Sequence, residues 1–373
     1  MESPVGGRVT INGHQVDYFA GCGYLGLQSH PSVLMATQEA LRQYGVATAT
    51  SRGGFGEHAL YHQLEQEVCR FFNAEKSLHF ASGYLGMSIL TQTNASAHDH
   101  IFIDKQAHYC LWDAAQATNK PITPFRHLSA QHLQECLQRN LEPRERPLVL
   151  SDGVFPISGE IAPLPNYLAL LQPYHGHIFL DDAHAVGVLG ENGRGTAEYF
   201  QVDTDACRTT ATLSKALGGW GGILWGEAKW IERVDRASNI LAGASPPPLV
   251  MTAASACALA IARTQPRLRQ DLRHNIQLVR DGLRDLGWQV EDSPVPIICL
   301  HHHPGMDLRH IQRELFQMKI AIEFVHSYSS APAGGALRIA IFATHTPQQI
   351  ERLLAAFKQV SRQPGHASGL STQ

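Results

Sequence analysis

The chain has 373 residues, of which 44% are hydrophobic and 17% are charged, with a formal net charge of −3 and a pI near 6.7. This length suggests roughly two or three domains and a core large enough to need neither disulfides nor metals. The near-neutral charge gives no electrostatic reason to expect nucleic acid or an anionic membrane as a partner, so small molecules are the expected ligands.

The N-terminal part of the chain predicts an arm followed by two helices. Residues 1–30 are rich in glycine and contain short β-like pieces such as RVTINGHQVDYF, which predict an arm or a small hairpin. From Pro31, apolar residues recur at helical spacing as far as Tyr44, and Gly45 is expected to end this helix. A second amphipathic helix is predicted at about 59–72.

The middle of the chain, which we assign to a large domain at 31–250, alternates short apolar runs with helical stretches. The predicted strands are SLHF, HIFID, PLVLSD, HIFLDD, TTATLS and GGILWG. Strands separated by helices imply a mostly parallel sheet, in which ligands bind beyond the carboxyl ends of the strands. The polar residues that end these runs are therefore candidates for one shared site, namely Asp104, Asp152, Asp181 and Lys215.

The C-terminal part predicts a smaller α+β domain at 251–362. A long helical region at about 249–287 follows a run of three prolines. It precedes the apolar or alternating segments WQVED, PIICLHHH, IAIEFV and ALRIAIF, with helices predicted at 307–318 and 347–360. The polar tail at 363–373 predicts disorder. No metal site is expected, because the three adjacent histidines of PIICLHHH cannot all face one ion.

Cysteine usage and the N-terminus indicate the compartment. Seven cysteines are scattered along the chain and no two form a CxxC pair, which is typical of reduced thiols in a cytoplasmic protein. The first residues, MESPVGGRVT, lack the apolar stretch of a signal peptide. The longest nearly apolar run, 249–262, is shorter than the ~20 residues that span a bilayer. We therefore expect a soluble cytoplasmic protein without membrane contact.

Two segments at predicted strand ends carry the functional prediction. In LDDAH, Asp181 and His184 follow a hydrophobic strand, although an acid there could equally cap a helix. In TLSKALGGWGG, Lys215 lies between an apolar strand and a glycine-rich turn, and a purely structural turn is the alternative. Together they match what pyridoxal 5'-phosphate (PLP) requires: a lysine that forms a Schiff base, and a carboxylate that keeps the pyridine nitrogen protonated.

Eight motifs follow one another along the chain, namely YFAGCGYLGLQSHP, YGVATATSRGGFGEHALYHQLE, HFASGYLGM, DKQAHYCLWDAA, SDGVFPISGEIAPL, FLDDAHAVGVLGENGRG, TLSKALGGWGG and PAGGALRIAIFATHT. In these motifs, from about Tyr18 to Leu354, the chain resembles the α-oxoamine synthase family of fold-type I PLP-dependent enzymes. The resemblance implies an α/β fold with a mostly parallel seven-stranded sheet in the large domain and a small C-terminal α+β domain. It also implies a homodimer with active sites at the interface.

The same resemblance implies roles for individual residues. Lys215 matches the Schiff-base lysine, Asp181 the partner of the pyridine nitrogen, and His184 the hydrogen-bond partner of the phenolic oxygen. His108 matches the histidine that stacks on the pyridine ring. The residues that match phosphate-binding positions are Ser82, Gly83, Tyr84, Thr212 and, reaching the neighbouring subunit, Ser245. The residues that match substrate positions are Arg338, which takes the carboxylate, with Cys22 and Ser330.

The chain departs from the family pattern on the side of the acyl acceptor. Cys22 and Gly23 stand where the family commonly has Asn-Asp, and Pro156 stands where it has a serine. The Ser/Thr-rich stretch before the double proline is reduced to Gly-Ala-Ser245, and the N-terminal arm is short. The cofactor residues are retained, so the resemblance implies a divergent member.

The predicted function is condensation of an α-amino acid with an acyl thioester, either an acyl-CoA or an acyl carrier, giving an α-amino ketone with decarboxylation. An aminotransferase on the same scaffold is the alternative, since it needs the same lysine, aspartate and arginine but no CoA site. A PLP-binding protein without turnover is a third possibility. The retention of Lys215, Asp181, His184 and His108 argues against it, because such a protein would not require proton-transfer groups.

Overall fold

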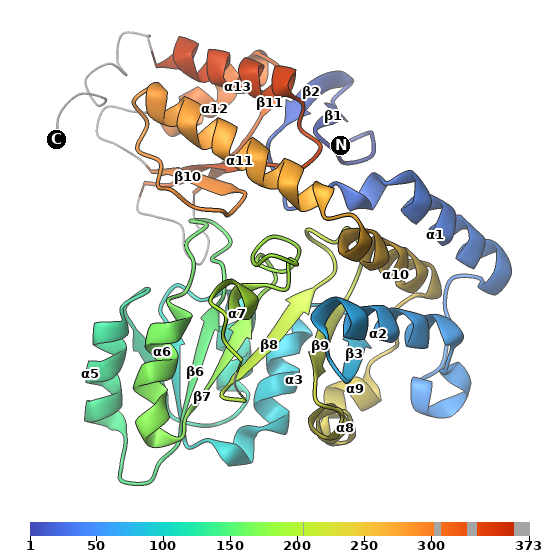
Figure 1. The fold of residues 1–373 in the computed structure, drawn as a ribbon, viewed down its shortest axis with the longest axis vertical. Helices are drawn as coiled ribbons and strands as arrows, with labels where there is room; N and C mark the ends of the chain where they lie inside the picture. The colour runs from blue at the N-terminus through green and yellow to red at the C-terminus, as the bar shows by residue number, and fades with distance from the viewer. Residues whose placement is uncertain (204, 302–306, 327–333, 362–373) are drawn as a thin grey trace.

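The computed structural model describes residues 1–203, 205–301, 307–326 and 334–361. A large sheet with helices on both faces forms one part of the molecule, and two small sheets covered by helices form the other (Figure 1). The chain begins beside the helices of this second part (Figure 1). No helix in the described part of the chain is long and apolar enough to cross a membrane.

The large sheet has seven strands in the order β3-β9-β8-β7-β6-β4-β5. The strands are β3 (Lys76–Phe80), β4 (His100–Asp104), β5 (Ile122–Phe125), β6 (Pro147–Asp152), β7 (His177–Asp181), β8 (Cys207–Thr212) and β9 (Gly222–Gly226). Only β9 runs against its neighbours, so the predicted mostly parallel seven-stranded sheet is confirmed. The sequence did not predict strand β5, which has four residues and lies at the edge of the sheet. It contains Pro124, which lacks a backbone N–H and is tolerated at an edge, where no neighbouring strand needs that donor.

Helices cover both faces of this sheet. The helices of this part of the chain are α1 (Pro31–Tyr44), which packs mainly on the later helix Leu249–Thr264, α2 (Ala59–Phe72), α3 (Leu85–Thr93), α4 (Tyr109–Gln116), α5 (Ala130–Asn140), α6 (Leu164–Leu171), α7 (Thr196–Tyr199), α8 (Ala228–Ala237) and α9 (Asn239–Gly243). Short 3₁₀ turns at Leu27–Ser29, Ala95–Ala97 and Gln172–Tyr174 and a π turn at Arg52–Gly56 complete the connections. The helix predicted from Pro31 ends where expected, because Gly45 has a φ of 74° and breaks the helical backbone. Met87 and Leu111 pack on one face of the sheet, and Leu133 and Tyr167 pack on the other.

The C-terminal part contains α10 (Leu249–Thr264), α11 (Arg267–Asp285), β10 (Ile297–His301), α12 (Leu308–Gln317), β11 (Ile320–Ala321), β12 (Glu323–Val325), β13 (Ala336–Ala340) and α13 (Pro347–Val360). The helical region predicted at about 249–287 consists of two helices, α10 and α11, which are separated at Pro266 because its ring cannot continue the preceding helix. WQVED forms no strand. The antiparallel sheet β10-β13-β12 brings Glu323 opposite Arg338.

The N-terminal arm forms the predicted hairpin, β1 (Arg8–Ile11) and β2 (His14–Tyr18). The turn residues Asn12 and Gly13 both have positive φ, as a two-residue hairpin turn requires. Strand β2 also pairs in parallel with β11, so the first residues of the chain share a three-stranded sheet with the C-terminal part. The segment IAIEFV, expected as one unit, is divided between this sheet and that of β12.

Candidate active site

A cavity of about 350 Å³ opens at the carboxyl ends of β6, β7 and β8, in the size range of small-molecule sites. Most of the residues predicted from the sequence line it together, namely Cys22, Ser82, Gly83, Tyr84, His108, Asp152, Asp181, His184, Thr212, Lys215 and Arg338. They come from segments separated by more than three hundred positions, from Cys22 to Arg338. The structure therefore assembles one site from residues that the sequence shows only in order.

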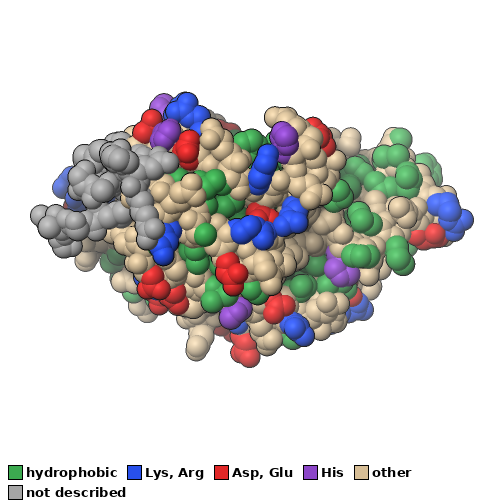
Figure 2. All heavy atoms as spheres, turned by 90° about the horizontal axis from the view of Figure 1, so that it is seen from above, with side chains coloured by type: hydrophobic (Ala, Val, Ile, Leu, Met, Phe, Trp, Pro, Cys, Tyr) green, Lys and Arg blue, Asp and Glu red, His purple; other side chains and the backbone are tan. Residues whose placement is uncertain are grey.

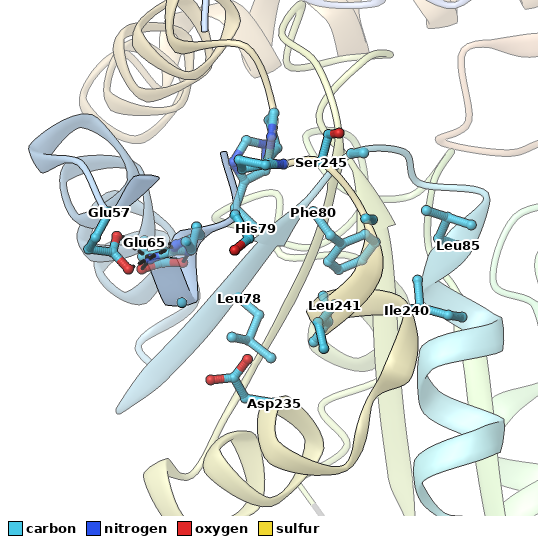
Figure 3. A pocket seen from close by; sticks show the side chains of 18 of the residues that line it. Glu57, Glu65, Leu78, His79, Phe80, Leu85, Asp235, Ile240, Leu241 and Ser245 are labelled. Carbon is cyan, nitrogen blue, oxygen red and sulfur yellow. Dashed lines mark hydrogen bonds and ion pairs between the residues drawn. The ribbon is translucent and has the colours of Figure 1, made fainter. Parts of the chain in front are cut away.

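Ser245 does not line this cavity. It lies on the wall of a second cavity, of about 660 Å³, between the N-terminal end of α2, strand β3 and helix α9 (Figure 3). One wall of that cavity is apolar, with Leu78 and Phe80, and the other carries Glu57 and Glu65 (Figure 3). Ser330 lies outside the described residues.

Asp104 does not line the site either, which corrects the expectation that all four strand-end residues converge. Its side chain instead accepts hydrogen bonds from His127 Nδ1 at 2.8 Å and from the Leu128 amide at 2.9 Å. His127 Nε2 lies 3.1 Å from a carboxylate oxygen of Glu160. Burial lowers the pKa of His127, but the hydrogen bonds to the two carboxylates outweigh it and raise this pKa to about 9. Asp104 is therefore part of an ion-paired network beside the sheet.

A chain of hydrogen bonds runs through the site from Arg338 to Lys215. Arg338 donates to the Tyr24 hydroxyl at 3.2 Å, Tyr24 lies 2.8 Å from His184 Nδ1, and His184 Nε2 lies 2.7 Å from Lys215 Nζ. A guanidinium can only donate, so the Tyr24 oxygen accepts from Arg338, while its hydroxyl can either donate to His184 Nδ1 or accept from it. Tyr24 was not predicted as a site residue, since a buried tyrosine within an apolar stretch gives no chemical signal in the sequence.

Burial keeps the middle of this chain uncharged. The pKa of His184 lies well below its usual value because the ring is buried and because Lys215 and Arg338 oppose a further positive charge. The pKa of Tyr24 lies well above its usual value, mainly because of burial. A neutral His184 carries its proton on one ring nitrogen, so it donates to one of its two neighbours, Tyr24 and Lys215, and accepts from the other. The unprotonated form of a lysine amine is the one that makes a Schiff base.

Asp181 ends β7 and is held in place through both oxygens. One oxygen accepts from the Ala183 amide at 2.9 Å, and the other accepts from the Cys110 thiol at 3.3 Å. Cys110 Sγ also lies 3.0 Å from His108 Nδ1, so one thiol contacts both the acid and the histidine. Asp152 accepts from the His108 amide at 2.9 Å, and burial together with the charge of Asp181 raises the pKa of Asp152.

A third group of residues lies where β3 meets α3. The Tyr84 amide donates to the Ser82 hydroxyl at 3.3 Å, and the amides of Leu85 and Gly86, in the first turn of α3, donate to the carbonyls of Ser82 and Gly83 at 3.0 and 3.1 Å. The hydroxyls of Thr212 and Ser214 lie 2.7 Å apart. A Cβ on Gly83 would stand 2.6 Å from the Thr212 side chain, so only glycine allows this approach.

The residues of this cavity fit PLP. The cavity provides an amine (Lys215), a carboxylate close to it (Asp181), a ring (His108), and a cradle for an anionic group that a side chain at Gly83 would fill. This donor set contains a group for the aldehyde, the pyridine nitrogen and the phosphate of the cofactor, and His184, 2.7 Å from Lys215, offers a partner for its phenolic oxygen.

Known proteins with similar sequences and structures include PLP-dependent enzymes. The family described as aminotransferase class I and II matches residues 22–357. The 8-amino-7-oxononanoate synthase of Geobacter sulfurreducens is 32% identical over 366 residues, which cover 96% of this chain and 92% of that protein. A serine palmitoyltransferase of S. paucimobilis, solved with PLP and myriocin bound, matches with a TM-score of 0.89 and 26% identity, covering 97% of this chain and 91% of that one. The 8-amino-7-oxononanoate synthase of Francisella tularensis shares the fold, with a TM-score of 0.77 at 22% identity over 93% of this chain and 98% of that one.

Proposed function

Since this chain belongs to the aminotransferase class I and II family, we propose that it is a PLP-dependent α-oxoamine synthase that condenses an α-amino acid with an acyl thioester. The product would be an α-amino ketone, formed with loss of CO2. The acyl donor would be an acyl-CoA or an acyl carrier. The observation that carries this proposal is the chain of hydrogen bonds that joins a lysine amine to a buried arginine across one cavity.

We infer the following roles for the residues that would hold the cofactor. Lys215 would bind PLP covalently, Asp181 would pair with the pyridine nitrogen, His184 would bind the phenolic oxygen, and His108 would stack on the ring. The residues that would hold the phosphate are Ser82, Gly83, Tyr84 and Thr212. When bound, PLP supplies an electron sink that stabilises negative charge at the Cα of the amino acid.

The chain's own residues would then bind the substrate and move its proton. Arg338 would bind the amino acid's carboxylate, which would replace the Tyr24 hydroxyl and the Cys22 sulfur as acceptor of the Nη2 protons. Lys215 Nζ, freed when the amino acid takes its place, would remove a proton with the single lone pair of its unprotonated amine, which is available when His184 Nε2, 2.7 Å away, accepts an N–H of that amine. Cys22, which lies 3.6 Å from Arg338, would contact the substrate near its carboxylate.

An absorbance experiment tests this function. The purified holoprotein is titrated with a panel of amino acids, with and without acyl-CoAs, while cofactor absorbance and free thiol are recorded. A spectral change that grows with thioester, together with thiol release, is the expected result. Conversion to the pyridoxamine form that a keto acid reverses would instead indicate an aminotransferase. No response to any amino acid would indicate a PLP-binding protein without turnover.

A lysine variant tests the central residue. Lys215→Ala is expected to lose the absorbance band of covalently bound PLP, because no other lysine lines the cavity in the described part of the chain. Lys76→Ala, on the surface and paired with Glu232, should retain the band. Persistence of the band in Lys215→Ala would overturn the assignment.

We also propose that the protein is a cytoplasmic homodimer. Met35, Val46 and Phe55 are 67%, 60% and 102% exposed, and Figure 2 shows hydrophobic side chains gathered at the end of the molecule where Figure 1 draws α1. Such a patch is typical of a surface that another subunit covers. Ser245, on the wall of a separate cavity, could then serve a neighbouring subunit's site. All seven cysteines are unpaired thiols, which supports a reducing compartment.

For the domains, we propose an arm at 1–30, a large PLP-binding domain at 31–250, a small domain at 251–362 and a tail at 363–373. The seven-stranded sheet lies wholly within the second range. The pairing of β2 with β11 supports an arm that packs on the small domain.

A further inference from the structure

The guanidinium of Arg338 has no donor left over in this fold. Its side chain is 3% exposed, and all three of its nitrogens make hydrogen bonds. The acceptors are the carbonyl oxygens of Pro156 (2.8 Å) and Gly21 (3.0 Å), a carboxylate oxygen of Glu323 (3.0 Å), the Tyr24 hydroxyl (3.2 Å) and the Cys22 sulfur (3.6 Å). Of these five acceptors only Glu323 carries a full negative charge. Arg338 is therefore already neutralised by a carboxylate of its own chain.

Glu323 is well placed to meet a ligand. It lies on β12 directly opposite Arg338 on β13, and it lines the same cavity as Lys215. Its second carboxylate oxygen accepts from the Gly21 amide at 3.3 Å, which fixes the group from two sides. Its side chain is nevertheless 43% exposed, in contrast to the buried Arg338. A molecule that enters the cavity toward Arg338 thus meets the carboxylate of Glu323 on its way.

The pairing of Arg338 with Glu323 affects which ligand charge the site favours. A buried arginine alone would favour any carboxylate, whereas the Arg338–Glu323 pair has no net charge. A second carboxylate that binds Arg338 would lie within a few ångströms of Glu323, and like charges at such a distance repel. A positive group carried by the same ligand would remove that repulsion, because it could pair with Glu323 while the ligand's carboxylate takes Arg338.

We propose that Glu323 is a specificity-determining residue that makes the site select amino acids with a cationic side chain over neutral ones, and neutral ones over anionic ones. This inference rests on the proposed function, because it takes Arg338 as the group that binds the substrate carboxylate. It adds the charge class of the amino acid for this chain, which the motifs do not specify and which differs from the neutral serine named for the serine palmitoyltransferase of S. paucimobilis.

A charge series of ligands tests the inference in the unmodified protein. Ornithine, glutamine and glutamate have side chains of similar length with charges of +1, 0 and −1. Their dissociation constants are measured from the absorbance change of bound PLP, which reports binding without turnover. The expected order is ornithine tightest and glutamate weakest, with about tenfold between neighbours, which corresponds to ~1.4 kcal/mol per step. Equal affinity for the three, or the reverse order, would overturn the inference.

A variant then assigns the selectivity to one side chain. Glu323→Gln keeps one oxygen that can accept from Arg338 and loses the negative charge, together with the acceptor of the Gly21 amide. It should bind glutamine about tenfold and glutamate about a hundredfold more tightly, so that the three ligands bind with similar affinity. Glu351→Gln, which removes the same charge at an exposed position on α13, should keep the order of the unmodified protein.

The outcomes separate this inference from the proposed function. If amino acids change the cofactor spectrum but the order is the same with and without Glu323, the specificity inference is wrong and the proposed function stands. If no amino acid changes the spectrum of either protein, the proposed function fails and the inference fails with it.

Discussion

The hydroxyl of Tyr24 should contribute more to stability than that of any comparable buried tyrosine, because two polar side chains depend on it. In Tyr24→Phe, His184 Nδ1 loses its hydrogen-bond partner at 2.8 Å, and Arg338 loses an acceptor at 3.2 Å. A neutral hydrogen bond is worth about 0.5–1.5 kcal/mol, and one to a charged group about 1.5–3 kcal/mol. The substitution should therefore lower the free energy of unfolding by about 2–4 kcal/mol. Urea denaturation followed by tryptophan fluorescence measures this change.

Two other buried tyrosines provide matched controls. Tyr61 donates one neutral hydrogen bond to the Pro247 carbonyl at 2.8 Å, so Tyr61→Phe should cost about 1 kcal/mol. Tyr167 is fully buried and its hydroxyl has no partner among the described residues, so Tyr167→Phe should be neutral or slightly stabilising. The same loss in Tyr24→Phe as in Tyr167→Phe would show that the hydrogen-bond chain contributes nothing, and the reasoning about the site would fail.

Two further predictions concern the surroundings of the site. The pKa of His127 is about 9 in the folded protein and about 6.5 in the unfolded chain, so protonation of His127 adds about 3 kcal/mol to the free energy of unfolding. This contribution is complete below pH 6.5 and disappears as the pH rises through 9. Unfolding measured at pH 6 and at pH 9.5 should show this loss in the unmodified protein and not in His127→Gln; equal losses in both would contradict it. In Gly83→Ala, the new Cβ meets the Thr212 side chain, which should weaken PLP binding at least about tenfold in equilibrium dialysis, corresponding to ~1.4 kcal/mol. Gly243→Ala, which meets nothing within 4 Å, should bind PLP normally, and normal binding by Gly83→Ala would contradict the proposed cradle.

Periodic elements were predictable because their signals are local. The helix at Pro31–Tyr44 carries its apolar spacing and its glycine stop within fifteen residues, and its bounds agree with the structure. Strand β5 was not predictable, because four residues with an internal proline carry no such pattern. The division between α10 and α11 at Pro266 could have been predicted from that proline, but apolar residues recur at helical spacing on both sides of it, so the region was predicted as one helical segment.

For the site, the sequence alone determined which residue types carry chemistry and in what order. Lys215, Asp181 and His184 stand in two motifs that together predict them as site residues, and the structure brings all three to one cavity. Only the tertiary structure decided which groups touch. It excluded Asp104 and Ser245 from the cavity, added Cys110 and Glu323 to its lining, and added Tyr24 to the hydrogen-bond chain. The physical reason is distance along the chain. The contact between Glu323 and Arg338 depends on the register of two strands, and that between Tyr24 and His184 joins residues 160 positions apart, which no local pattern encodes.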